Sequence, residues 1–143
     1  MAIAEYTPEQ SWTKLSEDPT AIMVDVRTRA EWSFVGVPDL SALGKDPILL
    51  EWKVFPTMET NTDFGDALEN ALGEGQPSEI LFLCRSGVRS LAAAQLMTDI
   101  FAARGKDIKC INIAEGFEGD LDSSAHRGTM NGWKARGLAW RQS

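Results

Sequence analysis

The chain has 143 residues, of which 43% are hydrophobic and 24% charged, as in an ordinary globular protein rather than a disordered or membrane-embedded one. The length is that of one domain, and the net charge of −7 makes binding to nucleic acid or to an anionic membrane surface unfavourable. No apolar run reaches the ~20 residues of a membrane span, and no secretory signal pattern is visible, so we expect a cytoplasmic protein with no membrane partner.

Helical and extended signals alternate along the chain. A capping box at residues 7–10 predicts a helix that runs through Leu15, after a short strand. The apolar run 21–26 predicts a strand, and a second capping box at 28–31 begins a short helix. The remaining expected elements are a loop at 35–46, a strand at 47–52, a helix at 61–75, a buried strand at 79–83, a helix at 90–105 and a strand at 108–113.

This alternation of apolar strands and helices predicts an α/β fold. We expect a central parallel sheet of about five strands with helices on both faces, because continuous apolar strands are buried from both sides. No internal repeat or linker divides the sequence, so residues 1–143 are interpreted as a single domain. Its core spans about 5–119, and we expect the Gly-rich tail 120–143 to pack on that core.

The two cysteines, Cys84 and Cys110, are too few for a disulfide framework, and His126 is the only histidine. We therefore expect no metal site and no other cofactor. Cys110 lies inside the predicted strand 108–113 and is interpreted as a buried strand residue. A resolving role toward Cys84 remains an alternative if their two strands adjoin.

The stretch LFLCRSGVRS, residues 81–90, predicts a strand that ends in a short loop and then a helix. In an open parallel sheet ligands bind at the carboxyl ends of the strands. Loop amides, the positive end of the helix dipole and the guanidinium groups of Arg85 and Arg89 all favour a thiolate at Cys84. Gly87 permits the backbone turn that such a ring of amides needs. The alternative, a cysteine that only fills the core, explains neither the cations nor the loop.

The same residues resemble a known family. CRSGVRS resembles the active-site loop of the rhodanese family, Cys-Arg-x-Gly-x-Arg/Thr, and MVDVRTRAEW resembles the family's first signature; together the resemblance extends from about Tyr6 to Gly119. It implies a rhodanese-like fold and a sulfurtransferase in which Cys84 is the catalytic nucleophile. The loop residues that it implies for substrate binding are Arg85, Ser86, Gly87, Val88, Arg89 and Ser90.

The resemblance also implies the chemistry of the partners. A small anionic sulfur donor such as thiosulfate loads Cys84 with a persulfide, which passes its sulfur to cyanide, a thiol or a protein thiol. A cysteine phosphatase is disfavoured, because its loop has five residues between cysteine and arginine and this loop has four. Two alternatives from other classes are a persulfide carrier or thiol sensor that acts on a protein partner, and an inactive interaction module, which we rank last because Cys84 is present.

Asp25 ends its predicted strand and should lie at the same edge of the sheet as Cys84. We expect it to orient Arg89 or Arg27 through charge-assisted hydrogen bonds; the alternative is a carboxylate that only orders the loop or the helix start. Glu31 is expected to cap its helix rather than to act in catalysis.

The tail has two interpretations. His126, Arg127 and Trp133 could fold over the Cys84 loop as a lid, or Trp133 and Trp140 could cover the apolar edge of the sheet. We favour covering.

Overall fold

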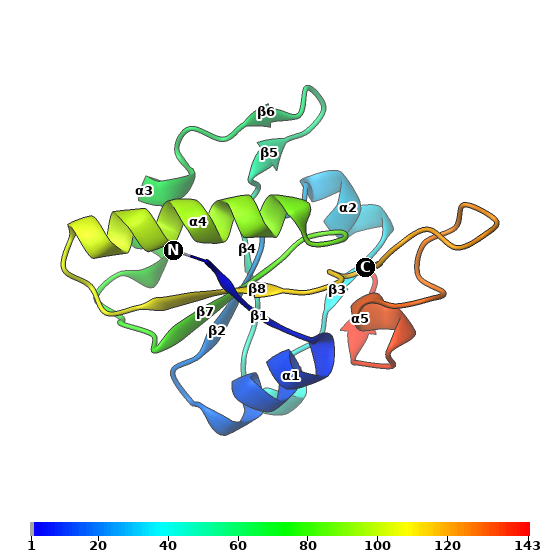
Figure 1. The fold of residues 1–143 in the computed structure, drawn as a ribbon, viewed down its shortest axis with the longest axis horizontal. Coiled ribbons are helices and arrows are strands. Elements are labelled where there is room, and N and C mark those ends of the chain that lie inside the picture. Colours follow the sequence, from blue (N-terminus) through cyan, green and yellow to red (C-terminus); the bar gives the residue numbers. More distant parts are fainter. Residues whose placement is uncertain (1) are drawn as a thin grey trace.

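The computed structural model describes residues 2–143, and its centre is one sheet of five parallel strands in the order β1-β8-β7-β2-β4 (Figure 1). The strands are β1 Ala4–Tyr6, β2 Ile22–Asp25, β4 Ile48–Leu49, β7 Glu79–Leu83 and β8 Lys109–Ile113. All five residues of β7, at the centre, are buried. The predicted α/β fold with about five parallel strands is confirmed.

Helices cover both faces of this sheet. The helices are α1 Pro8–Glu17, α2 Arg29–Phe34, α3 Phe64–Leu72, α4 Val88–Ala103 and α5 Gly132–Ala135. The helices α3 and α4 lie on one face, where Phe64 and Met97 join a core with Phe82 of β7. On the other face Leu15 of α1 and Trp133 of α5 join a second core (Figure 1).

Local hydrogen bonds explain where the first two helices begin. The Thr7 hydroxyl accepts from the Gln10 N–H at 3.1 Å, and the Gln10 side chain accepts from the Thr7 N–H at 2.9 Å. Thr28 and Glu31 form the same reciprocal pair at the start of α2. Both predicted capping boxes are confirmed, and each satisfies amides that a helix start leaves without an intrahelical partner.

The prediction that residues 35–46 form a loop was wrong in part. It contains a strand, β3 Val37–Pro38, and a single 3-10 turn at Ser41–Leu43. The strand pairs antiparallel with β9 Trp140–Arg141, at the end of the tail. Its partner lies about a hundred residues away in sequence. The local pattern around Gly36 and Pro38 therefore could not predict the strand. A small hairpin of β5 Lys53–Val54 and β6 Glu59–Thr60 was not predicted either.

The tail contacts the rest of the chain through its aromatic residues. Trp133 is fully buried and meets Trp12 edge to face, with ring centroids 6.1 Å apart. Trp140 meets Phe117 in the same way at 6.2 Å. None of the helices in residues 2–143 combines the length and apolar character that crossing a bilayer requires.

Candidate functional site

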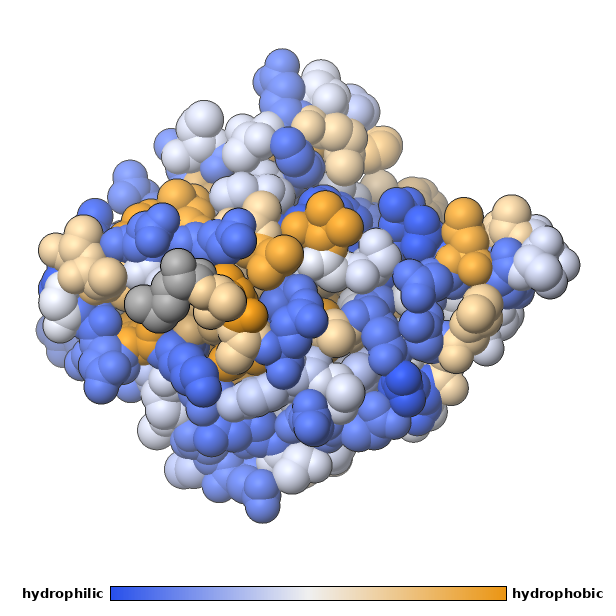
Figure 2. All heavy atoms as spheres, viewed as in Figure 1, coloured by the Kyte–Doolittle hydropathy of each residue, from blue (hydrophilic) through white to orange (hydrophobic). Residues whose placement is uncertain are grey.

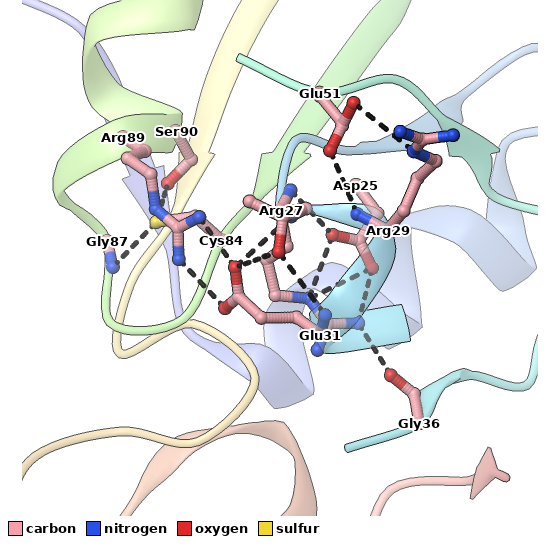
Figure 3. Close-up of polar contacts among 11 residues, drawn as sticks. Asp25, Arg27, Arg29, Glu31, Gly36, Glu51, Cys84, Gly87, Arg89 and Ser90 are labelled. Atoms are coloured by element: carbon pink, nitrogen blue, oxygen red, sulfur yellow. Dashed lines mark hydrogen bonds and ion pairs between the residues drawn. The ribbon is translucent and has the colours of Figure 1, made fainter. Parts of the chain in front are cut away.

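Cys84 lies directly after the last residue of β7, and its side chain is held by the loop that follows (Figure 3). The Gly87 N–H donates to Cys84 Sγ at 3.1 Å, and the Ser90 hydroxyl lies 3.1 Å from the same sulfur. Gly87 has φ +114, a conformation that residues with a Cβ rarely adopt, and α4 begins at Val88. The residue is only 1% exposed, so a reacting atom must reach Sγ past the loop.

A buried polar chain continues behind the sulfur. The Ser90 hydroxyl donates to Asn112 Oδ1 at 2.6 Å, and the Asn112 amide donates to Glu5 at 2.8 Å and to the Gly87 carbonyl at 3.2 Å. The two acceptors fix the orientation of the Asn112 amide, so its oxygen faces Ser90. Sequence reasoning missed Asn112, although a polar side chain inside the otherwise apolar residues 110–113 was a signal that could have identified it.

The carbonyl groups of the loop are turned away from the sulfur and bonded elsewhere. The Cys84 carbonyl accepts from the Phe117 N–H at 2.8 Å, and the Arg85 carbonyl accepts from the Glu118 and Gly119 N–H groups at 3.0 and 3.2 Å. These acceptors are satisfied from behind, and on the other side one loop amide, the Gly87 N–H, donates to Sγ. The segment that follows β8 therefore shapes the loop.

Gly116 makes this close backbone contact possible. It has φ +67, and a Cβ built on it would lie 2.5 Å from the carbonyl oxygens of both Cys84 and Arg85. No side chain fits there, so the residue must be glycine for the loop to keep its position.

Arg89 is bound by a residue that was predicted only as a cap. Its Nη1 lies 2.7 Å from Glu31 Oε1 and its Nη2 lies 2.9 Å from Oε2, a bidentate pair (Figure 3). Burial alone would lower the pKa of Arg89, but the hydrogen bonds and charge of Glu31 raise it, with Cys84 adding to the effect. Burial likewise opposes ionisation of Glu31, and the pair with Arg89 nevertheless brings the pKa of Glu31 below its usual value. Both side chains are therefore charged at neutral pH.

Of the two arginines considered for Asp25, the structure places Arg27 beside it. Arg27 Nη2 and Nε lie 2.7 and 2.9 Å from the Asp25 carboxylate, and both side chains are completely buried. Arg27 also donates to the Gly36 carbonyl at 2.8 Å (Figure 3). Its guanidinium lies 4.2 Å from the centre of the Phe117 ring. The pair thus connects the end of β2 to the Phe117 segment that supports the Cys84 loop.

An open groove of about 750 Å³ borders the loop on its outer side. Arg85 lines it from the loop, Arg89 from the first turn of α4, Glu31 from α2, and His126 and Arg127 from the tail. The two interpretations of the tail therefore apply to different residues. His126 and Arg127 lie beside the Cys84 loop, whereas Trp133 lies in the core. The loop residues Ser86 and Val88 are half-buried and exposed, respectively.

Cys110 does not approach Cys84. It lies opposite Ile80 in the sheet, four residues before Cys84, which separates the two by ~13 Å at the usual rise of a strand. A disulfide needs Cα atoms within about 7 Å, and both cysteines are free. Burial raises the pKa of Cys110 to about 11, and the hydrogen bond with Thr98 acts in the opposite direction. A resolving role is not supported by this register.

Within residues 2–143 no group of three or more His, Cys, Asp or Glu residues could hold a metal ion. No family model matches the chain.

The chain is similar over its whole length to proteins from two bacteria. The crystal structure of Rv0390 from M. tuberculosis is 43% identical, covers 100% of both chains and has a TM-score of 0.86. An uncharacterized protein of Rickettsia conorii, RC0915, is 34% identical over 99% of each sequence.

Two more distant structures share the fold. A rhodanese-like domain protein from Staphylococcus aureus has a TM-score of 0.52 at 19% identity and covers 99% of each chain. The polysulfide-sulfur transferase homodimer from Wolinella succinogenes has a TM-score of 0.58 at 16% identity, covering 99% of this chain and 80% of that one. At these identities the likeness concerns the arrangement of the elements.

Proposed function

We propose that the chain, which shares the fold of rhodanese-like proteins, is a sulfurtransferase that carries sulfur as a persulfide on Cys84. The observation that carries the proposal is the surroundings of Cys84 Sγ. A loop amide donates to the sulfur, the loop carbonyls are bonded on the far side, and two arginines flank the loop. Such an arrangement stabilises a sulfur anion, which is the state that both halves of the reaction need.

The first half loads the enzyme. The Cys84 thiolate attacks the outer sulfur of an anionic donor such as thiosulfate, a new S–S bond forms, and the donor's own S–S bond breaks. The electron pair of that bond leaves with sulfite, so no oxidant or reductant is required. The positive charge of Arg85 at the mouth of the loop attracts the donor.

The second half returns the free enzyme. An acceptor, cyanide or a thiolate, attacks the outer sulfur of the persulfide, and the bonding pair returns to Cys84 as a thiolate. The Gly87 N–H, which already donates to Sγ, is placed to stabilise the terminal sulfur anion as well. Arg89 acts as a positioning residue, because Glu31 occupies its donors and holds it against the loop.

Intact-mass measurement tests the proposal directly. Purified protein incubated with thiosulfate should gain the mass of one sulfur atom, Cys84→Ser should gain none, and Cys110→Ser should behave as the wild type. Addition of cyanide should remove the sulfur as thiocyanate, and a thiol or protein thiol should be compared as acceptor. An unmodified wild-type protein, with thiosulfate and with an organic persulfide as donors, would refute the proposal.

A further inference from the structure

The arginines of this acidic chain divide into two groups. Five arginines pair with a carboxylate: Arg27, Arg29, Arg89, Arg104 and Arg136. Among residues 2–143, the other three, Arg85, Arg127 and Arg141, have no carboxylate oxygen within the 4.0 Å of an ion pair, although the net charge is −7. Arg141 lines a different pocket, whereas Arg85 and Arg127 line the groove beside the Cys84 loop. Two cations without a protein counter-ion at one groove are suited to an anionic ligand.

Backbone hydrogen bonds fix the positions of these two arginines relative to each other. Arg127 Nη1 donates to the Gly119 carbonyl at 2.6 Å, and the Gly128 N–H donates to the Glu118 carbonyl at 2.7 Å. The N–H groups of the same two residues, Glu118 and Gly119, bond the Arg85 carbonyl. One dipeptide therefore positions both Arg85 and the segment that carries Arg127.

Asp122 orders the turn that presents Arg127. Its carboxylate accepts from the N–H groups of Ser124 and His126 at 2.8 and 2.9 Å and from the Thr129 hydroxyl at 2.6 Å. A turn whose backbone is bonded in this way loses little entropy when a ligand binds. The segment projects beside α2 at the edge of the molecule, and Figure 2 shows an apolar group on it among hydrophilic neighbours.

The groove also has an apolar part and is larger than an inorganic donor requires. Val35, Met58 and Leu121 line that part, and Leu121 is 51% exposed. Its volume of about 750 Å³ falls within the ~300–1,000 Å³ of sites for organic ligands. Because Cys84 is 1% exposed, only a thin reacting end can reach Sγ, and a bulkier body has to stay in the groove.

We infer that this groove binds the non-reacting part of an organic sulfur donor, a persulfide whose carbon chain carries a carboxylate. Arg85 and Arg127 bind the carboxylate, and the carbon chain packs on Val35, Met58 and Leu121. The inference rests on the proposed sulfurtransferase function. In the transfer the Cys84 thiolate attacks the terminal sulfur of R–S–SH, the donor S–S bond breaks, and R–S⁻ leaves with its electron pair while Cys84–S–SH keeps the proton.

Matched donors test the inference. The persulfides of ω-mercaptocarboxylic acids with short, medium and long alkyl chains are compared with the persulfides of the corresponding neutral amides, and kcat/KM for loading Cys84 is measured for each. The wild type should prefer the carboxylate over the amide by about tenfold at one chain length, mainly through KM, as expected for one charge-assisted contact. Arg127→Gln should abolish most of this preference, and Arg127→Lys should restore part of it.

Two further variants complete the experiment. Glu118→Gln removes a negative charge from the groove and should raise the preference for the carboxylate. Arg141→Gln, at an exposed arginine that lines a different pocket, should leave the preference unchanged. A carboxylate preference that is absent in the wild type, or that survives Arg127→Gln undiminished, overturns the inference. Loading of the wild type by thiosulfate is measured first, so failure of the proposed function is recognised separately.

Discussion

The two cysteines of this protein lie on the same face of the sheet, one within β8 and one just after the neighbouring β7, yet their surroundings differ. Cys110 lies within β8, its backbone is part of the sheet, and burial raises its pKa to about 11. Cys84 lies one residue beyond β7, where the backbone amides that follow are no longer used by the sheet and one of them donates to Sγ. Both are at most 5% exposed, so exposure does not distinguish them.

The difference shows that the end of a strand, rather than the thiol itself, creates the candidate site. Amides become available only where the ladder of hydrogen bonds stops, and they face the sulfur only where something else binds the carbonyls. The Gly116 to Gly119 segment does this for Cys84. Cys110 has no such segment behind it, because its strand continues to Ile113.

Of the substitutions that test the difference between the two cysteines, Gly116→Ala should have the largest effect on the Cys84 site. The added Cβ collides with the Cys84 and Arg85 carbonyl oxygens, and φ +67 is itself unfavourable for alanine by about 1–2 kcal/mol. We expect Gly116→Ala to reduce persulfide formation at Cys84 about a hundredfold or more and to destabilise the fold by several kcal/mol, about 2–5. Intact mass and urea unfolding measure the two effects.

Gly105 provides the matched control. It has the same φ of +67, but a Cβ there would meet nothing within 4 Å. Gly105→Ala should cost about 1 kcal/mol of stability and leave sulfur loading intact. Equal behaviour of the two variants would contradict a specific role of Gly116 behind the loop.

Replacing Glu31 by glutamine should have a smaller effect. Glutamine preserves the capping box of α2 but removes the charge that holds Arg89, so we expect sulfur loading to fall about tenfold with little change in secondary structure. Glu51→Gln, which alters the partly exposed pair with Arg29, is the control and should change loading less than about twofold. If both variants load equally well, Arg89 does not need Glu31.

The pair of Glu31 and Arg89 also predicts in which direction stability changes with pH. The pKa of Glu31 is lowered in the folded protein, so its contribution to stability is present above its unfolded value of about 4.3 and is lost as the pH falls through the folded value. Glu31→Gln should therefore lose less stability than the wild type on acidification. A thermal melting series from neutral to acidic pH measures the difference, and parallel curves would contradict the pairing.

Cys110→Ala should leave sulfur loading at Cys84 unchanged. The substitution should instead change the stability of the protein at alkaline pH. Because the folded pKa of Cys110 is raised to about 11, the stabilisation by its neutral form is present below the unfolded pKa and is lost as the pH rises through about 11, up to about 3 kcal/mol. Unfolding in urea at neutral pH and near pH ~10 should show a smaller alkaline loss for the variant than for the wild type.

Most of the fold could be predicted because its signals are local. The capping pairs at Thr7 and Thr28 join residues three apart. The strand of residues 79–83 can be predicted from its own apolar run. The sequence around Cys84 likewise determined that a loop rich in amides and cations follows a buried strand. These features need no knowledge of distant residues.

Tertiary structure alone decided which distant groups meet. The pairing of Arg89 with Glu31, the strand formed by β3 with β9 and the approach of Gly116 to the Cys84 carbonyl join segments far apart in the chain. Each carboxylate, arginine or glycine has several acceptable partners in principle, and only the packing of the sheet and helices selects one. For that reason the sequence alone placed Cys84 at the end of a buried strand, whereas the fold decided which arginine of the groove is held by a carboxylate and which two, Arg85 and Arg127, line it without one.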